Sequence, residues 1–279
     1  MLSKQQLLDF NTNGYLLFDR LIEKTELENL RAAASRILET FDITKNQAVF
    51  STTDRDRGRD QYFIDSAENI SCFLEADAFD KDGKLCRPKN KCINKIGHAM
   101  HDLDPAFTHF ARLPVFGEMI RDLGYAAPVL WQSMYIFKQP RIGGEVRWHQ
   151  DASYLITDPA NVTGLWIAME DAHKDNGCLW VQPGGHRSQL REIYQVDWTN
   201  REGKLSDLDK TPWPDGKDAV AVEVPAGSVV VFHDHMPHYS SANLSEHSRH
   251  AFTMHVSEKN SEWPSANWLQ RPTLGDFQL

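Results

Sequence analysis

The sequence predicts a mainly β protein, a sandwich or jelly roll with helices packed outside it. After Pro128, apolar and polar residues alternate with a period of two, which is typical of strands with one buried face. These stretches recur at short intervals with turn residues between them, as in all-β sandwiches and barrels. Before about residue 126, the apolar spacing is mostly helical.

The amino-terminal part contains the helical signals. A capping-box pattern precedes a short helix that ends at Gly14, and residues 15–18 predict a brief strand. Residues 25–41 predict an amphipathic helix, because their apolar side chains recur at three- and four-residue spacing. Residues 94–110 predict a further helix that ends before Pro114.

Polar segments separate these elements. Residues 43–60 end in a run of mixed charges, which predicts a solvated loop or a mobile flap over a pocket. His98 and His101 lie three residues apart, so they either pair on a metal or serve as hydrogen-bonded or solvent-facing residues. Residues 192–218 are rich in turn residues and predict an insertion on the rim of the fold.

The carboxyl-terminal half contains the expected strands. Asn176-Gly177 supplies the positive φ angles of a tight hairpin between two of them. The strands are expected at residues 131–138, within 146–154, and at 165–170, 178–181, 219–224, 228–232 and 249–256.

Length and composition limit the class of protein. A chain of 279 residues is expected to form one domain over residues 1–279, with helices in about 1–125 packed on a core at about 126–260. The hydrophobic fraction of 41% and charged fraction of 25% are those of a globular protein. A net charge of −9 opposes nonspecific attraction to nucleic acid or to anionic membranes.

Four cysteines lack paired CxxC spacing, which predicts reduced thiols in a cytoplasmic protein. Neither a signal peptide nor an apolar run of membrane-spanning length is apparent. We expect a small-molecule substrate and neither a nucleic-acid, a membrane nor an obligate protein partner.

The stretch Val146 to Tyr154 holds the first candidate metal ligands. If it is extended, His149 and Asp151 share one face and Gln150 points away. An imidazole and a carboxylate would then converge, and a second histidine would complete the facial arrangement used by non-haem Fe(II). His-x-Asp alone is a weak signal, since most such pairs are surface or core residues.

The third ligand should come from a distant strand, because a jelly roll brings early and late strands together. His233, His235 and His238 are the candidates. His233 and His235 would share a strand face, whereas His238 follows Pro237, where the chain must bend. Spacing alone leaves the choice open.

Several motifs together resemble the phytanoyl-CoA dioxygenase family, and within it the phytanoyl-CoA dioxygenase domain-containing proteins. The likeness runs from the first helix to nearly the end of the chain. The motifs are H-Q-D-A-S-Y-L from residue 149, L-W-I-A-M-E-D-A from 165, N-G-C-L-W-V-Q-P-G-G-H from 176, and G-S-V-V-V-F-H-D-H-M-P-H-Y-S-S-A-N from 227.

The resemblance implies a double-stranded β-helix core, jelly-roll and cupin-like, and a ferrous ion held by His149, Asp151 and His238. It also implies that Arg249 binds the far carboxylate of 2-oxoglutarate. The further residues implied in the 2-oxoglutarate pocket are Lys95, Met134, Trp166 and Ser240.

The implied activity is that of a 2-oxoglutarate-dependent dioxygenase. It would convert 2-oxoglutarate and oxygen to succinate and carbon dioxide while hydroxylating a C–H bond of a small organic or acyl-type substrate, with ascorbate as a reductant. The carboxylate at Asp151 argues against halogenase chemistry. The alternatives are a cupin-like isomerase or hydrolase that uses another metal, and a catalytically silent binding module. Specificity is expected in the loops at 43–60 and 192–218.

A role for five basic residues is a further expectation. They would attract an anionic substrate, or equally lie in solvent. The residues are Arg55, Arg57, Arg59, Arg141 and Arg147.

Overall fold

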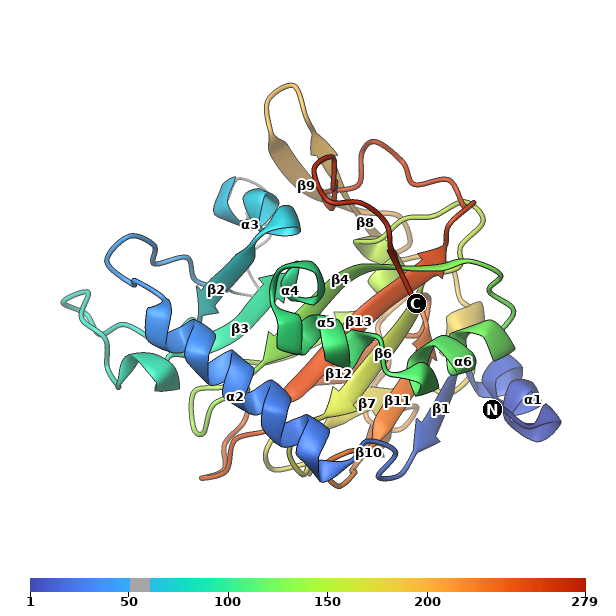
Figure 1. Ribbon diagram of the computed structural model, residues 1–279, viewed down its shortest axis with the longest axis horizontal. Coiled ribbons are helices and arrows are strands. Elements are labelled where there is room, and N and C mark those ends of the chain that lie inside the picture. The colour runs from blue at the N-terminus through green and yellow to red at the C-terminus, as the bar shows by residue number, and fades with distance from the viewer. Residues whose placement is uncertain (51–60) are drawn as a thin grey trace.

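A large antiparallel sheet is the centre of the protein. The computed structural model describes residues 1–50 and 61–279, and within them this sheet has eight strands (Figure 1). In spatial order they are β1 (Tyr15–Phe18), β11 (Val229–His233), β6 (Thr163–Ala168), β13 (Ala251–Glu258), β4 (Pro128–Ile136), β3 (Ile93–His98) and β2 (Ile70–Leu74), while β14 (Phe277–Gln278) also pairs with β4.

A smaller sheet packs against one face of the large one. Among the described residues it has four strands, in the order β10 (Val220–Val222), β7 (Leu179–Val181), β12 (His238–Ser240) and β5 (Val146–His149). A separate hairpin of β8 (Glu192–Asp197) and β9 (Glu202–Asp207) projects from the rim (Figure 1). The two sheets give the expected jelly-roll core, so the predicted mainly β class with flanking helices is confirmed.

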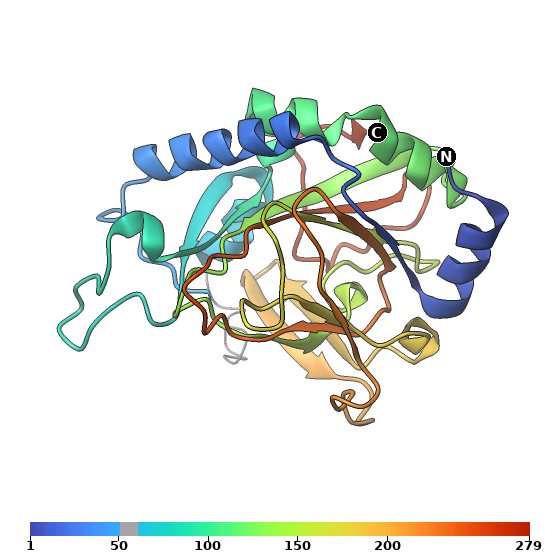
Figure 2. The same cartoon turned by 90° about the horizontal axis from the view of Figure 1, so that it is seen from below.

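The helices α2 (Lys24–Thr40), α4 (Met100–Leu103), α5 (Pro105–Ala111) and α6 (Pro114–Asp122) cover the opposite face of the large sheet, as Figure 2 shows. Helix α1 (Lys4–Asn13) precedes β1, and α3 (Gln61–Asp65) lies on the cavity side, where its Phe63 lines the cavity. Short 3₁₀ helices are η2 (Ser66–Glu68), η3 (Lys89–Lys91), η4 (Asp151–Ser153) and η5 (Gly185–Arg187). No helix in the described ranges combines the length and the apolar composition that a membrane span needs.

The local signals explain where the first helices begin and end. In α1, Ser3 and Gln6 form the reciprocal hydrogen bonds of a capping box, and Gly14 ends the helix at a φ of 79°. In α2, the buried side chains recur on one stripe, which faces the large sheet and α5. These two elements and the strand at 15–18 are as predicted.

The expected helix at 94–110 is wrong in its first part. Residues Ile93–His98 form β3, which pairs with both β2 and β4. Every residue of β3 is buried, since helices cover one face and the cavity wall uses the other. A short, fully buried strand does not alternate in polarity, so its pattern resembles that of a buried helix. Within the predicted range 94–110, helical structure begins only at Met100.

The expected hairpin at Asn176-Gly177 is also wrong. The flanking strands β6 and β7 lie in different sheets, and neither pairs with the other. Gly177 does have the positive φ of 84° that its turn requires, but the turn carries the chain from one sheet to the other. The amino-terminal part also contributes strands, since β1, β2 and β3 join the large sheet, and β14 follows the strand predicted to be last.

Candidate metal centre

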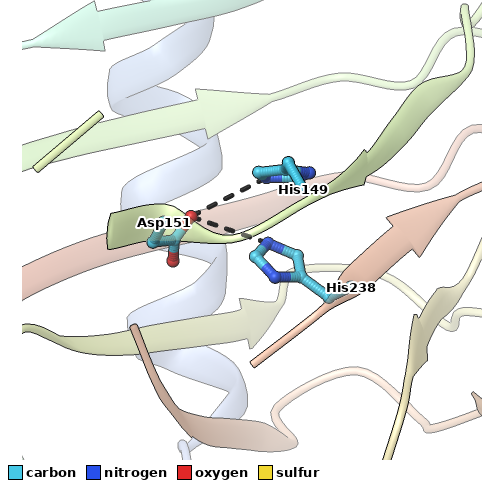
Figure 3. A group of neighbouring side chains, drawn as sticks. All are labelled: His149, Asp151 and His238. Carbon is cyan, nitrogen blue, oxygen red and sulfur yellow. Dashed lines mark ion pairs between the residues drawn. The ribbon is translucent and has the colours of Figure 1, made fainter. Parts of the chain in front are cut away.

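His149, Asp151 and His238 meet between the two sheets (Figure 3). Within the described residues they are the one group of three or more histidine, cysteine, aspartate or glutamate side chains whose ligand atoms all lie within 4.8 Å of one another. Strand pairing brings them together, because His238 of β12 is the partner of His149 in β5. The early pair and the late histidine therefore converge as expected.

The chain holds the early pair in place through the residue between them. β5 ends at His149, Gln150 stays extended, and Asp151 begins η4. The Gln150 side chain is fully buried; its amide donates to the carbonyl of His235 and accepts from the backbone N–H of Arg191. Gln150 thus points away from the cavity. Its hydrogen bonds hold the backbone in place, so that the side chains of His149 and Asp151 face the cavity.

Both histidines present the same ring nitrogen to the aspartate. Nδ1 of His149 donates to the Arg147 carbonyl and Nδ1 of His238 donates to the Met236 carbonyl, each at 2.9 Å. In the neutral form of each ring Nε2 keeps its lone pair, and these atoms lie 3.7 and 3.6 Å from Oδ1 of Asp151. Backbone carbonyls that orient ligand histidines in this way are typical of metal sites.

The protonation states suit a cation. Burial and the nearby His238 lower the pKa of His149 to about 3, so its imidazole is neutral at physiological pH. Burial alone would raise the pKa of Asp151, but His255 and His238 hold it below its ordinary value, so the carboxylate is charged. Two neutral imidazoles and one carboxylate on one face are the donor set that suits Fe(II) and leaves further positions open.

Arg249 lines the same cavity and lies just before the start of β13. Its side chain is buried, with Nε donating to the Gly177 carbonyl at 2.9 Å and Nη2 to Ser240 Oγ at 3.2 Å. Nη1 is buried without a partner among the described residues, which suits a bound carboxylate. The ring of Trp166 lies 5.4 Å from the guanidinium carbon.

The remaining predicted pocket residues also line this cavity, whose volume is about 170 Å³. Lys95 and Met134 lie on neighbouring strands, with Nζ of Lys95 3.7 Å from Sδ of Met134 and 3.6 Å from the centre of the Phe50 ring. The structure therefore brings Lys95, Met134, Trp166, Ser240 and Arg249 to one cavity together with the candidate ligands. Their roles in binding remain predictions.

Other histidines lie apart from the ligand group. His233 contacts Asp234, and its ring packs on His186 and His235. His98 bonds to Ser66, whereas His101 bonds to other residues on the opposite side of the sheet, so the two do not pair on a metal.

The basic residues considered for anion attraction are partly paired. Arg141 forms an ion pair with Glu246, and Arg147 pairs with Glu192 through both ends of its guanidinium. The charge run at 54–60 lies outside the described residues.

Several cavity residues were not predicted. His255 donates toward the second oxygen of Asp151, and Gln132 contacts His255. The period-two pattern of β13 places His255 on the same face as Thr253, which would have indicated a cavity position. Aromatic residues cover the other wall, and their spacing carries no signal because they come from unconnected segments. They are Phe50, Phe63, Tyr154 and Trp268.

Comparison with known proteins agrees with the site. The family model for phytanoyl-CoA dioxygenase (PhyH) matches residues 10–251. The chain is 44% identical to the phytanoyl-CoA dioxygenase of Arabidopsis thaliana over 275 residues, which covers 98% of this chain and 95% of the relative. It is 38% identical to the phytanoyl-CoA dioxygenase domain-containing protein 1 of Danio rerio, over 97% and 95% of the two chains.

Solved structures share the fold at lower identity. EctD from S. alaskensis, solved with 2-oxoglutarate and 5-hydroxyectoine, aligns with a TM-score of 0.63 at 18% identity, over 98% of this chain and 81% of that chain. SnoN, solved with Fe³⁺, α-ketoglutarate and nogalamycin RO, aligns with a TM-score of 0.65 at 13% identity, over 99% and 92%. With a family model that matches most of its length and relatives of about two-fifths identity, the chain belongs to the phytanoyl-CoA dioxygenase family.

Proposed function

We propose that this protein is an Fe(II)- and 2-oxoglutarate-dependent dioxygenase that hydroxylates a C–H bond of a small organic or acyl-type substrate. The observation that carries the proposal is the placement of two opposite binding features in one cavity. His149, Asp151 and His238 offer ligand atoms at one end, and a buried arginine with a free donor lies at the other. A dicarboxylate that chelates a metal would bridge them.

Each end would bind a different part of 2-oxoglutarate. His149, Asp151 and His238 would hold the ion, and two neutral ligands with one carboxylate leave a net positive charge that attracts the keto acid. Arg249 would bind the far carboxylate, while Ser240 and the Gly177 carbonyl fix the plane of the guanidinium. When bound, the ferrous ion and co-substrate supply oxidative decarboxylation to succinate and carbon dioxide, coupled to hydroxylation by oxygen.

The protein would contribute orientation and the exclusion of water. Trp166 and Met134 are apolar walls beside the proposed co-substrate, and Phe63, Tyr154 and Trp268 form the wall beyond the metal ligands. A dry, aromatic wall favours reaction with an apolar part of the substrate over reaction with water.

We also propose the accessory features expected from the sequence. Oxygen is the second co-substrate, ascorbate serves as a reductant, and residues 1–279 act as one cytoplasmic dioxygenase unit without an obligate protein partner.

The test is anaerobic titration of the protein with Fe(II) and then 2-oxoglutarate. A visible charge-transfer band at about 500 nm is expected when the keto acid chelates the metal. Replacing His238 by Ala should abolish the band, whereas replacing His233 by Ala should preserve it. If no band forms in the wild-type protein, the proposal is wrong.

Activity assays on the same protein and its variants distinguish two other functions from the dioxygenase. A cupin-like isomerase or hydrolase with Zn or Mn would act without 2-oxoglutarate and be indifferent to Arg249→Ala. A catalytically silent module would release no succinate in the presence of iron, ascorbate and 2-oxoglutarate. The unpartnered donor of Arg249 favours the dioxygenase, because neither alternative requires a buried carboxylate partner at that position.

A further inference from the structure

The two oxygens of Asp151 have different partners. Oδ1 faces Nε2 of both His149 and His238, at 3.7 and 3.6 Å. Oδ2 points the other way and lies 3.0 Å from Nε2 of His255. His255 lies in β13, is 3% exposed and lines the same cavity, but it is not one of the three candidate ligands.

The direction of the hydrogen bonds at His255 follows from its partners. A charged carboxylate only accepts hydrogen bonds, so Nε2 of His255 must donate to Asp151. In the neutral ring Nδ1 is then the acceptor, and Nε2 of the Gln132 amide lies 3.1 Å from it. Gln132 and His255 are register partners in β4 and β13. The chain Gln132 to His255 to Asp151 therefore has one consistent direction of donation.

The surrounding backbone is shaped for this arrangement. The other register partner of His255 is Gly164 in β6. A Cβ atom at Gly164 would lie 3.1 Å from Oδ2 of Asp151 and 2.7 Å from the Phe232 ring. The absence of a side chain leaves the space that Oδ2 occupies. On the other side, an irregularity in the pairing of β13 with β4 follows directly after His255, where a bulge re-aims side chains.

We propose that His255, oriented by Gln132, is a positioning residue that keeps Asp151 a one-oxygen ligand of the metal. With Oδ2 held by His255, only Oδ1 is free to bind, so the carboxylate takes one coordination position and three remain. If Asp151 bound through both oxygens, it would take a position that 2-oxoglutarate or oxygen needs. The inference rests on the proposed function for the identity of the metal, but its test does not require turnover.

The experiment compares metal binding by the full-length protein and its variants, without oxygen or 2-oxoglutarate. His255→Ala should raise the Kd for Fe(II) by about 10- to 100-fold, the usual effect of removing an outer partner of a metal ligand. His255→Gln retains an amide donor and should recover most of the affinity. Co(II) provides a second readout, because a change from one-oxygen to two-oxygen binding alters its visible absorption spectrum.

His101→Gln is the matched control. His101 is as buried as His255 and also bonds through both ring nitrogens, but it lies on the other face of the sheet. It should lower stability while leaving the Fe(II) Kd and the Co(II) spectrum unchanged. If it weakens metal binding as much as His255→Ala, the effect is general loss of structure and the inference is wrong.

Gln132→Leu covers the case in which His255→Ala does not fold. This variant keeps the His255 ring but removes the donor that fixes its tautomer, so a smaller rise in Kd and an altered Co(II) spectrum are expected. Wild-type binding and spectrum in every folded variant at these two positions would overturn the inference. A rise in Kd in a protein that gives no band with 2-oxoglutarate would support the inference and refute the proposed function.

Discussion

Two buried histidines on opposite faces of the large sheet have nearly the same kinds of partner. His255, on the cavity face, lies between the Gln132 amide and Asp151. His101, on the helix face, lies between the Ser133 hydroxyl at 2.9 Å and Asp102 at 3.0 Å. Both combine a neutral residue of β4 with an aspartate, so hydrogen bonding alone does not distinguish them.

The aspartates distinguish them. Asp102 forms an ion pair with Arg271 at 2.7 Å, and Arg271 also donates to the carbonyls of Leu130 and Trp131. The carboxylate of Asp151 has ion contacts with histidines only, in the part of the chain that the structure describes. We call His101, Asp102 and Arg271 the outer cluster, and His149, Asp151, His238 and His255 the inner cluster. The outer cluster contains its own cation, Arg271, whereas the inner cluster has no arginine or lysine partner for Asp151 among the described residues. A buried carboxylate needs a counter-charge, and the inner cluster fits one supplied by a bound metal ion.

The largest effect is expected when a candidate ligand is removed from the inner cluster. His238→Ala should abolish the charge-transfer band and weaken Fe(II) binding by more than the roughly 100-fold upper value for outer partners of a ligand. Its stability in the absence of metal should change little, because the inner cluster is incomplete without the ion. Fe(II) titration and thermal unfolding measure the two effects. A variant that still binds the ion would remove His238 from the site.

Removing the cation from the outer cluster should have the opposite result. Arg271→Leu leaves Asp102 buried without its partner, which costs about 3 kcal/mol of folding free energy or more. Fe(II) affinity should stay at the wild-type value, since Arg271 lies on the other face of the sheet. Urea unfolding and metal titration provide the measurements, with Arg271→Lys as a control that retains the charge. Weakened metal binding in Arg271→Leu would show that the two clusters are coupled.

Both clusters predict acid sensitivity of the metal-free protein. Burial and His238 lower the pKa of His149 to about 3, and burial with Arg271 lowers the pKa of His101 well below its ordinary value. Below pH 6.5 such histidines take up a proton only when the chain unfolds, so stability falls as the pH drops. Each contributes a slope of up to about 1.4 kcal/mol per pH unit. Urea unfolding between pH 7.5 and 5 should show shallower slopes in His149→Gln and His101→Gln, and unchanged slopes would contradict the neutral state of these rings.

The arginine of the cavity should control the co-substrate and not the metal. Arg249→Leu removes a charged donor pair, which is worth about 1.5–3 kcal/mol and corresponds to a rise of roughly 10- to 100-fold in the Kd for 2-oxoglutarate. Fe(II) affinity should be unchanged, because Arg249 contacts no candidate ligand. Titrating 2-oxoglutarate into the Fe(II)-loaded protein and following the charge-transfer band measures the effect. Unchanged 2-oxoglutarate affinity would place the far carboxylate elsewhere.

Local geometry in the sequence singled out the early candidate pair, whereas the late candidate, His238, came from the family resemblance. His149 and Asp151 follow from local geometry, since two residues flanking an extended Gln150 must face the same way. His238 depends on the pairing of β12 with β5, which joins residues almost ninety positions apart. No spacing rule chooses among His233, His235 and His238, and the family resemblance supplied the choice that the geometry agrees with.

Alternation also has a limit, which β4 illustrates. The period-two pattern places Gln132 and Ser133 on opposite faces of the strand, but it does not say which face lines the cavity. Both faces of the large sheet are buried, one under helices and one under the smaller sheet (Figure 2). The polarity of the residues therefore does not indicate which face lines the cavity. The prediction of a helix over β3 was wrong for the same reason. Only long-range packing assigns the two sides.

The smallest predicted effect uses these two neighbours. Ser133→Ala removes one buried hydrogen bond to His101 and should cost about 1 kcal/mol of stability. It should leave Fe(II) affinity unchanged, because its partner His101 contacts no ligand. Its sequence neighbour Gln132 should behave in the reverse manner, with a weaker effect on stability and a measurable effect on the metal. If both substitutions altered only stability, the two faces of β4 would be equivalent. The outer cluster, which has its own cation, and the inner cluster, which fits a metal ion, would then not differ in the way we infer.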